Sequence, residues 1–157
     1  MTKRKNCIFT VRTCVYGHAT KTRTATFATS NTGGTINSTG PVTVVCVKDI
    51  NLGGGKTLTL SGSASDIFVV NITGSISMGG GNRIRASGLP PSNVLYNVIG
   101  AGQNIVIGGA SVVDGALLTI GRNLDLSAGF VNGSVTSKGN INIGSGEQIP
   151  CPCPTKE

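Results

Sequence analysis

The sequence of 157 residues has no tryptophan, few aromatic side chains (4%) and few charged ones (12%). So few aromatic rings provide no stacking platform for bases, which makes nucleic acid an unfavoured partner. The chain has one histidine, His18, so a Ser/His/Asp or Cys/His catalytic site is poorly supplied. These shortages argue against catalysis and favour a structural or binding role.

Two sequence patterns are also missing. No segment has apolar residues at the i, i+3, i+4, i+7 spacing of an amphipathic helix, and none approaches the ~20 consecutive apolar residues of a membrane span. Glycine, in contrast, occurs at 24 positions, among many Val, Ile, Thr, Ser and Asn residues. β-Branched residues mixed with small turn-formers favour strands joined by tight corners. The sequence therefore predicts one all-β domain.

The positive charge lies mainly at the start of the chain. The net charge is +7, and the first 23 residues carry six basic groups and no acidic one. A basic opening, an apolar stretch and Gly17-His18-Ala19 resemble a secretory signal, although Arg12 interrupts the apolar part. Residues 1–34 are therefore predicted to be a degraded signal or a basic arm, with an irregular capping turn. A signal would place the protein outside the cell or on its surface, which is the location we expect.

The cysteines form neither a zinc motif nor a complete disulfide framework. Their odd number prevents full pairing, and Cys151 and Cys153 form a C-x-C pair rather than the C-x₂₋₄-C of structural zinc. We expect no metal, and we expect residues 147–157 to be a proline- and cysteine-containing tail, with an intermolecular disulfide as the alternative. The five cysteines are Cys7, Cys14, Cys46, Cys151 and Cys153.

A glycine-rich corner recurs after the pattern apolar-x-apolar. The spacings between successive copies are 26, 29, 19 and 17 residues, and the longer units contain extra polar or proline segments. Without those segments a unit has about 17–20 residues, the length of one β-solenoid turn with three short strands. The sequence predicts a right-handed parallel β-helix of about five turns over residues 35–146. The copies begin at Ile50, Ile76, Ile105, Leu124 and Ile141.

Each unit is expected to contribute an apolar strand such as VTVVCV, then the apolar-x-apolar triplet, then a strand after the glycines such as KTLTLSG. In each triplet, alternation places the two outer residues in the core and the middle one outside. The predicted core ladder is Ile50, Leu52, Ile76, Met78, Ile105, Ile107, Leu124, Leu126, Ile141 and Ile143. The predicted outward residues are Asn51, Ser77, Val106, Asp125 and Asn142.

The corners between strands have their own residue pattern. Glycines are expected where the backbone bends so sharply that a Cβ would clash. Polar residues before each triplet are expected to bond to backbone groups of their own or the next turn. Cys46 aligns with Ile72 and Ile120 and is expected to lie in the core. The polar corner residues are Asp49, Ser75, Asn104, Asn123 and Asn140.

From about residue 41 to 146 the chain resembles the β-solenoid domain of bacterial choice-of-anchor A surface proteins and, more distantly, ice-binding-protein-like adhesins. The segments that carry the resemblance are SDIFVVNITGSISMGGGNRI, VLYNV, GALL and NGSV. The resemblance implies a secreted or cell-surface solenoid, usually part of a larger exported protein with a C-terminal anchor. The sequence departs from this family in three ways: TIGRN replaces the usual APN segment, no C-terminal apolar anchor is evident, and the signal is poor. It also lacks the long helix of ice-binding solenoids.

Gly55-Lys56-Thr57 looks like the end of a phosphate-binding loop. That motif needs a glycine five residues before Gly55, where this sequence has Ile50, a predicted core residue. The next copy replaces Lys-Thr with Asn-Arg. The glycines therefore indicate a corner, and we expect neither a nucleotide nor any other cofactor.

A carbohydrate-active β-helix enzyme would need clustered carboxylates. Asp49 and Asp125 belong to turns three repeats apart, so they are expected to lie roughly 14 Å apart at about 4.8 Å per turn. That distance is too long for a paired acid and base, and the chain is predicted not to be an enzyme. The other acidic residues of the body are Asp66, Asp114 and Glu147.

Ice binding would need a flat outward array, usually of threonine. Thr57 and Thr59 begin such an array, but the next turn presents arginines instead, and the turn after that is expected to present Ser111 and Val113. A candidate surface-binding face remains, which would contact anionic polysaccharide or a membrane surface, or would simply keep the solenoid soluble. Its residues are Lys48, Lys56, Thr57, Thr59, Arg83, Arg85, Arg122 and Lys138.

The favoured hypothesis is a non-enzymatic surface module with a structural or adhesive role. The alternatives are an ice-surface or polysaccharide-binding protein and a carbohydrate-active β-helix enzyme. The partners that these hypotheses imply are extracellular polysaccharide, ice or another surface protein. End-to-end or cysteine-mediated self-association is a further expectation, because the end turns of a solenoid expose unpaired backbone edges.

Overall fold

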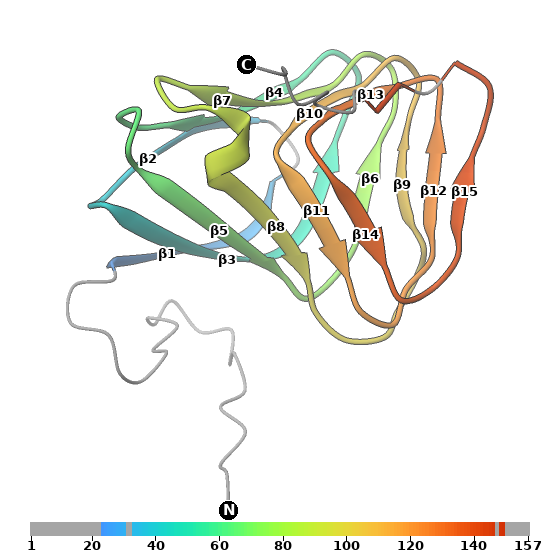
Figure 1. The fold of residues 1–157 in the computed structure, drawn as a ribbon, viewed down its shortest axis with the longest axis horizontal. Helices are drawn as coiled ribbons and strands as arrows, with labels where there is room; N and C mark the ends of the chain where they lie inside the picture. The colour runs from blue at the N-terminus through green and yellow to red at the C-terminus, as the bar shows by residue number, and fades with distance from the viewer. Residues whose placement is uncertain (1–22, 31–32, 147, 150–157) are drawn as a thin grey trace, which may run out of the picture.

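The computed structural model describes residues 23–30, 33–146 and 148–149, which form a β-solenoid of stacked parallel coils (Figure 1). Strands make up 55% of the structure. The described part contains no α-helix, and only a short 3₁₀ turn, η1 (Pro91–Asn93), interrupts the strands. Every strand pair is parallel. The predicted all-β parallel β-helix is confirmed.

The coils present three faces, one for each strand of the repeat (Figure 1). The first face contains β3 (Val42–Leu52), β5 (Ile67–Ile72), β8 (Val94–Val98), β11 (Ala116–Thr119) and β14 (Val135–Ser137). The second contains the end of β3, then β6 (Ile76–Met78), β9 (Ile105–Gly108), β12 (Leu124–Ser127) and β15 (Ile141–Ile143). The third contains β2 (Gly34–Asn37), β4 (Thr57–Ser61), β7 (Arg83–Ser87), β10 (Val112–Asp114) and β13 (Phe130–Asn132).

Strand β3 joins the first and second faces into one sheet. It pairs with β5 through its first half and with β6 through its second, which gives a ten-stranded sheet beside the five-stranded third face. On its other edge β3 pairs with β1 (Arg23–Ser30), which lies inside the segment 1–34 assigned to the arm and capping turn.

The predicted number of five turns is wrong, because the solenoid has about three. Three strands in full occur in the turns β5–β6–β7, β8–β9–β10 and β11–β12–β13. At the start, β3 runs through the first corner without a break. At the end, the described residues after β15 add only a bridge between Phe130 and Gln148 to the third face.

The inward side chains of all three faces form one hydrophobic core. In the predicted ladder, Ile50 pairs with Ile76 and Leu124 pairs with Ile105, and the eight ladder residues from Ile50 to Leu126 are buried, as predicted. The prediction is wrong for Ile141 and Ile143, which are 39% and 62% exposed. They lie on β15, which pairs with β12 on one side and, among the described strands, has no neighbour on the other.

The predicted outward positions of the second face are confirmed, with Asp125 half-buried and the other four exposed. Cys46 is buried as predicted, but its alignment is wrong by one residue. Cys46 lies opposite Asn71, Val47 lies opposite Ile72, and Ile120 is 56% exposed. The first-face strands are apolar on both sides, so alternation alone does not determine their register.

The glycine corners are as expected. Gly55, Gly80 and Gly109 have φ angles of 68°, 71° and 58°, a region that L-residues with a Cβ rarely adopt. A Cβ on Gly109 would lie 2.5 Å from the backbone nitrogen of Gly80 in the preceding turn. Successive turns therefore stack closely at this corner. Within the described part of the chain, no helix is long and apolar enough to cross a membrane.

Candidate functional site

The third face brings together five of the eight residues predicted to form a binding face. Strands β4 and β7 pair with Thr57 opposite Arg83 and Thr59 opposite Arg85. Lys56 precedes β4 at the corner, and the three basic side chains are exposed while the two threonines are half-buried. We call this group, Lys56, Thr57, Thr59, Arg83 and Arg85, the β4–β7 patch.

Core packing holds the β4–β7 patch outward. The residues that alternate with it, Leu58 and Leu60 on β4 and Ile84 on β7, are at most 4% exposed. Neighbouring strands lie about 4.8 Å apart and alternate residues on one strand about 6.6 Å apart. Two guanidinium groups and two hydroxyl groups therefore project from the same side of the two paired strands. Guanidinium groups bind carboxylates and sulfates through paired N–H donors.

The β4–β7 patch does not continue into β10. Val112 lies opposite Arg83, and Val113 lies opposite Ile84. Ser111 and Val113, predicted to point outward, are 0% and 1% exposed, so that prediction is wrong. A constant spacing in the sequence would have given the correct register. In three turns, the next strand begins five positions after the last core residue of the triplet. These steps run from Leu52 to Thr57, from Met78 to Arg83 and from Ile107 to Val112.

Asp114, at the end of β10, is engaged in structural contacts. Its carboxylate accepts hydrogen bonds from the backbone N–H of Ala86 and the side-chain amide of Asn132, both at 3.1 Å. Its backbone carbonyl accepts a 2.9 Å hydrogen bond from the buried hydroxyl of Tyr96. Burial, together with the nearby Asp114 charge, raises the pKa of Tyr96 well above its usual value. This group stabilises the fold rather than adding to the patch.

Lys48 and Lys138 are exposed, but they lie away from the β4–β7 patch. Both occupy the corner between the first and second faces, Lys48 within β3 and Lys138 just after β14. Strands β5, β8 and β11 lie between β3 and β14, so the two lysines are about four strand spacings, roughly 19 Å, apart. They do not form one surface with the patch.

Arg122 was predicted to belong to the surface face, but its side chain is only 4% exposed, so this prediction is wrong. Nε donates to the carbonyl oxygen of Gly100 at 2.9 Å, and Nη1 donates to that of Gly74. Nη2 donates to the carbonyl oxygen of Thr73 at 2.9 Å, and more weakly to those of Ile99 and Ala101 at 3.2 and 3.4 Å. The guanidinium is thus held by backbone carbonyls from two earlier turns.

The extra loop in the third repeat explains this burial. Residues 100–103 are the inserted GAGQ segment between β8 and β9. The regular ladder ends with the hydrogen bond from Ile99 N–H to the carbonyl of Ile72. Beyond it, the carbonyls of Thr73 and Gly74 meet Arg122 instead of the neighbouring backbone. Gly102 lies directly against the guanidinium, since a Cβ there would be 2.9 Å from Cζ.

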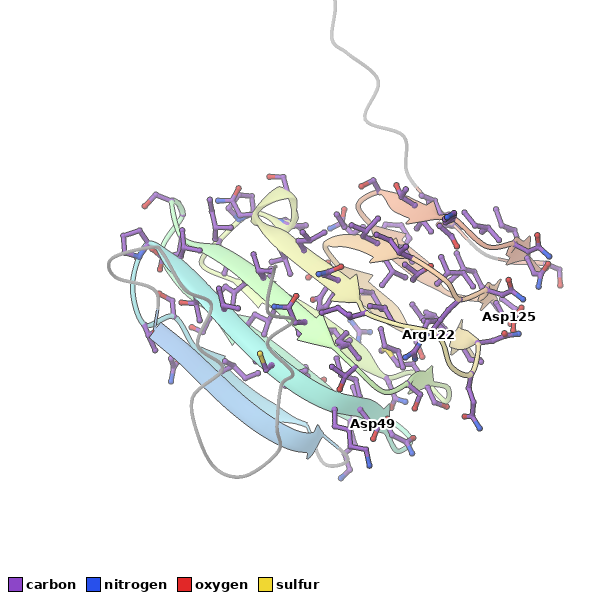
Figure 2. The ribbon with its side chains drawn as sticks, turned by 90° about the horizontal axis from the view of Figure 1, so that it is seen from below. Asp49, Arg122 and Asp125 are labelled. Carbon is purple, nitrogen blue, oxygen red and sulfur yellow. The ribbon has the colours of Figure 1, made fainter. Side chains whose placement is uncertain are left out.

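The four described carboxylates of the body, Asp49, Asp66, Asp114 and Asp125, belong to different strands or loops, and Figure 2 shows Asp49 and Asp125 well apart, with Arg122 between them. Strands β6 and β9 separate β3 from β12. Asp125 accepts hydrogen bonds from the amides of Asn142 at 2.6 Å and Asn104 at 2.8 Å, and these bonds, that from Asn142 first, lower its pKa. Asp49 and Asp125 are thus three strand spacings, roughly 14 Å, apart, which is too far for them to act together as acid and base.

The predicted capping role of the polar corner residues is confirmed at two positions. Asp49 accepts a 2.7 Å hydrogen bond from the backbone N–H of Ser75, and Asn123 accepts one of 3.0 Å from that of Asn140. Asn104 instead donates to the side chain of Asp125. These side chains link successive turns at the corner between the first and second faces.

Some of the candidate residues lie outside the described residues. They are Cys7, Cys14, His18, Glu147, Cys151 and Cys153. Within residues 33–146 and the other described positions, no group of three His, Cys, Asp or Glu side chains is arranged to hold a metal ion.

Comparison with known proteins adds no relative to this description. No protein-family model matches the chain, and no curated protein or solved structure is significantly similar to it.

Proposed function

We propose that the chain is a non-enzymatic β-solenoid module of a secreted or cell-surface protein, with a structural or adhesive role. We further propose that it adheres to anionic extracellular polysaccharide through the β4–β7 patch. The right-handed sense of the coil is part of the same proposal, because right-handed crossovers dominate parallel β connections. The resemblance to choice-of-anchor A domains supports the surface location.

The observation that carries the proposal is the register of β4 against β7. It places Arg83 beside Thr57 and Arg85 beside Thr59 on one face. Lys56 adds a third cation at the adjacent corner. The polymer that this surface suits is one with regularly spaced carboxylate or sulfate groups, since guanidinium forks bind such groups and hydroxyls complete their hydrogen bonding.

The same register argues against the ice-surface alternative. Among the described strands of the third face, threonines lie opposite each other only across β2 and β4, where Thr35 lies opposite Thr59. On β7 the corresponding positions are arginines, which interrupt the array. Inhibition of ice recrystallisation by the purified protein would favour that alternative over ours.

The enzyme alternative would require a carboxylate free to transfer a proton. Asp125, Asp114 and Asp49 each accept two hydrogen bonds from neighbouring turns. Turnover of an acidic or neutral polysaccharide, lost on Asp125→Asn or Asp114→Asn, would contradict a non-enzymatic function.

Affinity chromatography tests the proposal directly. Columns carrying a polyuronate, a sulfated polysaccharide and neutral dextran are loaded with the full chain at low salt. We expect retention on the two anionic columns, elution with rising salt because the contacts are electrostatic, and no retention on dextran. Equal retention on dextran, or none on any column, would contradict the proposal.

A further inference from the structure

Beside the β4–β7 patch, the third face carries polar side chains that have no charge. The strands of this face are ordered β2, β4, β7, β10 and β13. Asn37 on β2 lies opposite Ser61 on β4, and Ser61 lies opposite Ser87 on β7. Thr35 on β2 lies opposite Thr59 of the patch. We call the uncharged residues outside the patch the neutral strip, and its members are Thr35, Asn37, Ser61 and Ser87.

The neutral strip faces outward and is accessible to a ligand. The side chains that alternate with it on β2 and β4 are in the core, with Ile36 and Leu60 at 5% and 0% exposure. Ser61 is half-buried, and the other three members of the strip are exposed. Their hydroxyl and amide groups both donate and accept hydrogen bonds, as the hydroxyl groups of a neutral sugar do. Short side chains also lose less rotamer freedom on binding than lysine or arginine. The strip therefore suits an uncharged sugar.

The β10 side of the patch is unlike the neutral strip. Val112 on β10 lies opposite Arg83. Asp114 Oδ2 accepts a 3.1 Å hydrogen bond from the backbone N–H of Ala86, which places a carboxylate against β7, one residue beyond Arg85. An anionic polymer that extended over β10 would therefore meet an apolar side chain and a like charge. A ligand held by the two arginines is expected to extend over β4 and β2 instead.

We propose, on the basis of the function proposed above, that the polysaccharide bound by the third face has neutral sugars between its anionic ones. Its anionic group lies on Arg83 and Arg85, and a neutral sugar lies over the neutral strip. Strand β2 is two strand spacings, roughly 10 Å, from β7, and the outward side chains of β2 and β4 carry no charge. A second carboxylate or sulfate over these side chains would lose hydration without gaining a cation. A neutral sugar avoids that cost and gains hydrogen bonds.

Two oligosaccharides of equal length test this ligand class. In the first, every sugar is a uronate, and in the second, uronate alternates with a neutral N-acetylated sugar. Calorimetric titration at moderate salt measures the affinity of the full chain for each. We expect the alternating oligosaccharide to bind at least about threefold more tightly. Attraction by net charge alone would give the opposite order, because the first oligosaccharide carries more charges.

A variant of the neutral strip tests where the neutral sugar lies. Thr35→Val/Ser61→Ala removes two hydroxyl groups and leaves the cations of the patch in place. It should weaken binding of the alternating oligosaccharide by about fivefold or more, and that of the uronate oligosaccharide by less than about twofold. The small effect on the second ligand also shows that the variant is folded. Thr136→Val/Ser77→Ala, the same substitutions at exposed positions of the other two faces, is the control and should change neither affinity by more than about twofold.

Two results would overturn this inference and leave the proposed function standing. One is tighter binding of the uronate oligosaccharide than of the alternating one by the unmodified protein. The other is an equal effect of Thr35→Val/Ser61→Ala on the two ligands, or no effect on either. A different result would contradict the proposed function as well: no binding of either oligosaccharide, or undiminished binding of both by Arg83→Glu/Arg85→Glu.

Discussion

Nη2 of Arg122 donates a 2.9 Å hydrogen bond to the carbonyl oxygen of Thr73, which lies two turns earlier in the solenoid. A single side chain thereby connects three successive coils. It does so where the inserted loop 100–103 interrupts the backbone ladder. Although Arg122 is charged, its side chain is buried at this corner and has a structural role.

Replacing Arg122 by methionine is expected to destabilise the protein by about 3 kcal/mol or more, because buried carbonyls then lose their donors. Arg122→Lys should recover only part of this loss, since an ammonium group cannot reach the same set of acceptors as a planar guanidinium. Urea denaturation measures both. Lys138→Met, at an exposed lysine of the same corner, is the control and should change stability by less than about 0.5 kcal/mol. Equal effects at the two positions would contradict the structural role of Arg122.

Alanine substitutions at two corner glycines, Gly55 and Gly109, distinguish the cost of backbone strain from the cost of a steric clash. Both have a left-handed φ, but a Cβ on Gly55 meets nothing within 4 Å, whereas one on Gly109 lies 2.5 Å from Gly80 N. Gly55→Ala should therefore cost about 1 kcal/mol. Gly109→Ala should cost at least about 2 kcal/mol more, because the backbone of the adjacent turn has to move. Similar thermal-denaturation midpoints for the two variants would contradict the close stacking at this corner.

The stacked repeat and its core could be predicted because both depend on local alternation. The ladder from Ile50 to Leu126 follows from the triplets alone. Ile141 and Ile143 have the same pattern, but their burial depends on a further coil that the pattern does not report. Likewise, alternation could not place Cys46 opposite Asn71, since its strand is apolar on both sides.

In the candidate site too, features that depend on the local pattern could be predicted, and those that depend on distant contacts could not. Lys56, Arg83 and Arg85 could be placed on one face, because they follow the same corner in consecutive repeats. The burial of Arg122 could not be predicted, because its partners are backbone carbonyl oxygens one and two turns away, which the pattern of side chains does not indicate. The one sequence signal was the GAGQ insertion, which removes backbone donors from the stack.

Asn82 and Ser111 occupy the same corner in successive turns, with different outcomes. Asn82 donates to the carbonyls of Leu52 and Gly79, both at 2.6 Å, and accepts from Lys56 N–H at 3.0 Å. The buried Oγ of Ser111 has no hydrogen-bond partner among the described residues. Asn82→Ala should destabilise by about 2 to 4 kcal/mol, and Ser111→Ala should be neutral or stabilising by up to about 1 kcal/mol. Chemical denaturation tests both, and a loss of more than about 1 kcal/mol in Ser111→Ala would contradict the assignment.

The hydrogen bonds of Asp66 are expected to make the stability of the folded protein depend on pH in the acid range. Its Oδ2 accepts hydrogen bonds from Ser38 Oγ at 2.5 Å and Ser63 N–H at 2.8 Å, and these lower its pKa below the usual 3.8, that from Ser38 first. A depressed pKa in the folded state contributes stability that is fully present above the unfolded value and is lost as the pH falls through the folded value. Between about pH 5 and pH 2, Asp66→Asn should therefore lose less stability than the unmodified protein. Parallel stability curves for the two proteins in that range would show that Asp66 does not contribute.

Binding measurements on two charge-reversed variants test the central claim most directly. Arg83→Glu/Arg85→Glu changes the β4–β7 patch, and Lys48→Glu/Lys138→Glu makes the same change in net charge at the other corner. With a sulfated polysaccharide at moderate salt, the first variant should bind at least about tenfold more weakly than the unmodified protein, and the second less than about threefold more weakly. Equal weakening in the two variants would show that net charge alone governs binding, and it would contradict a specific surface on the third face.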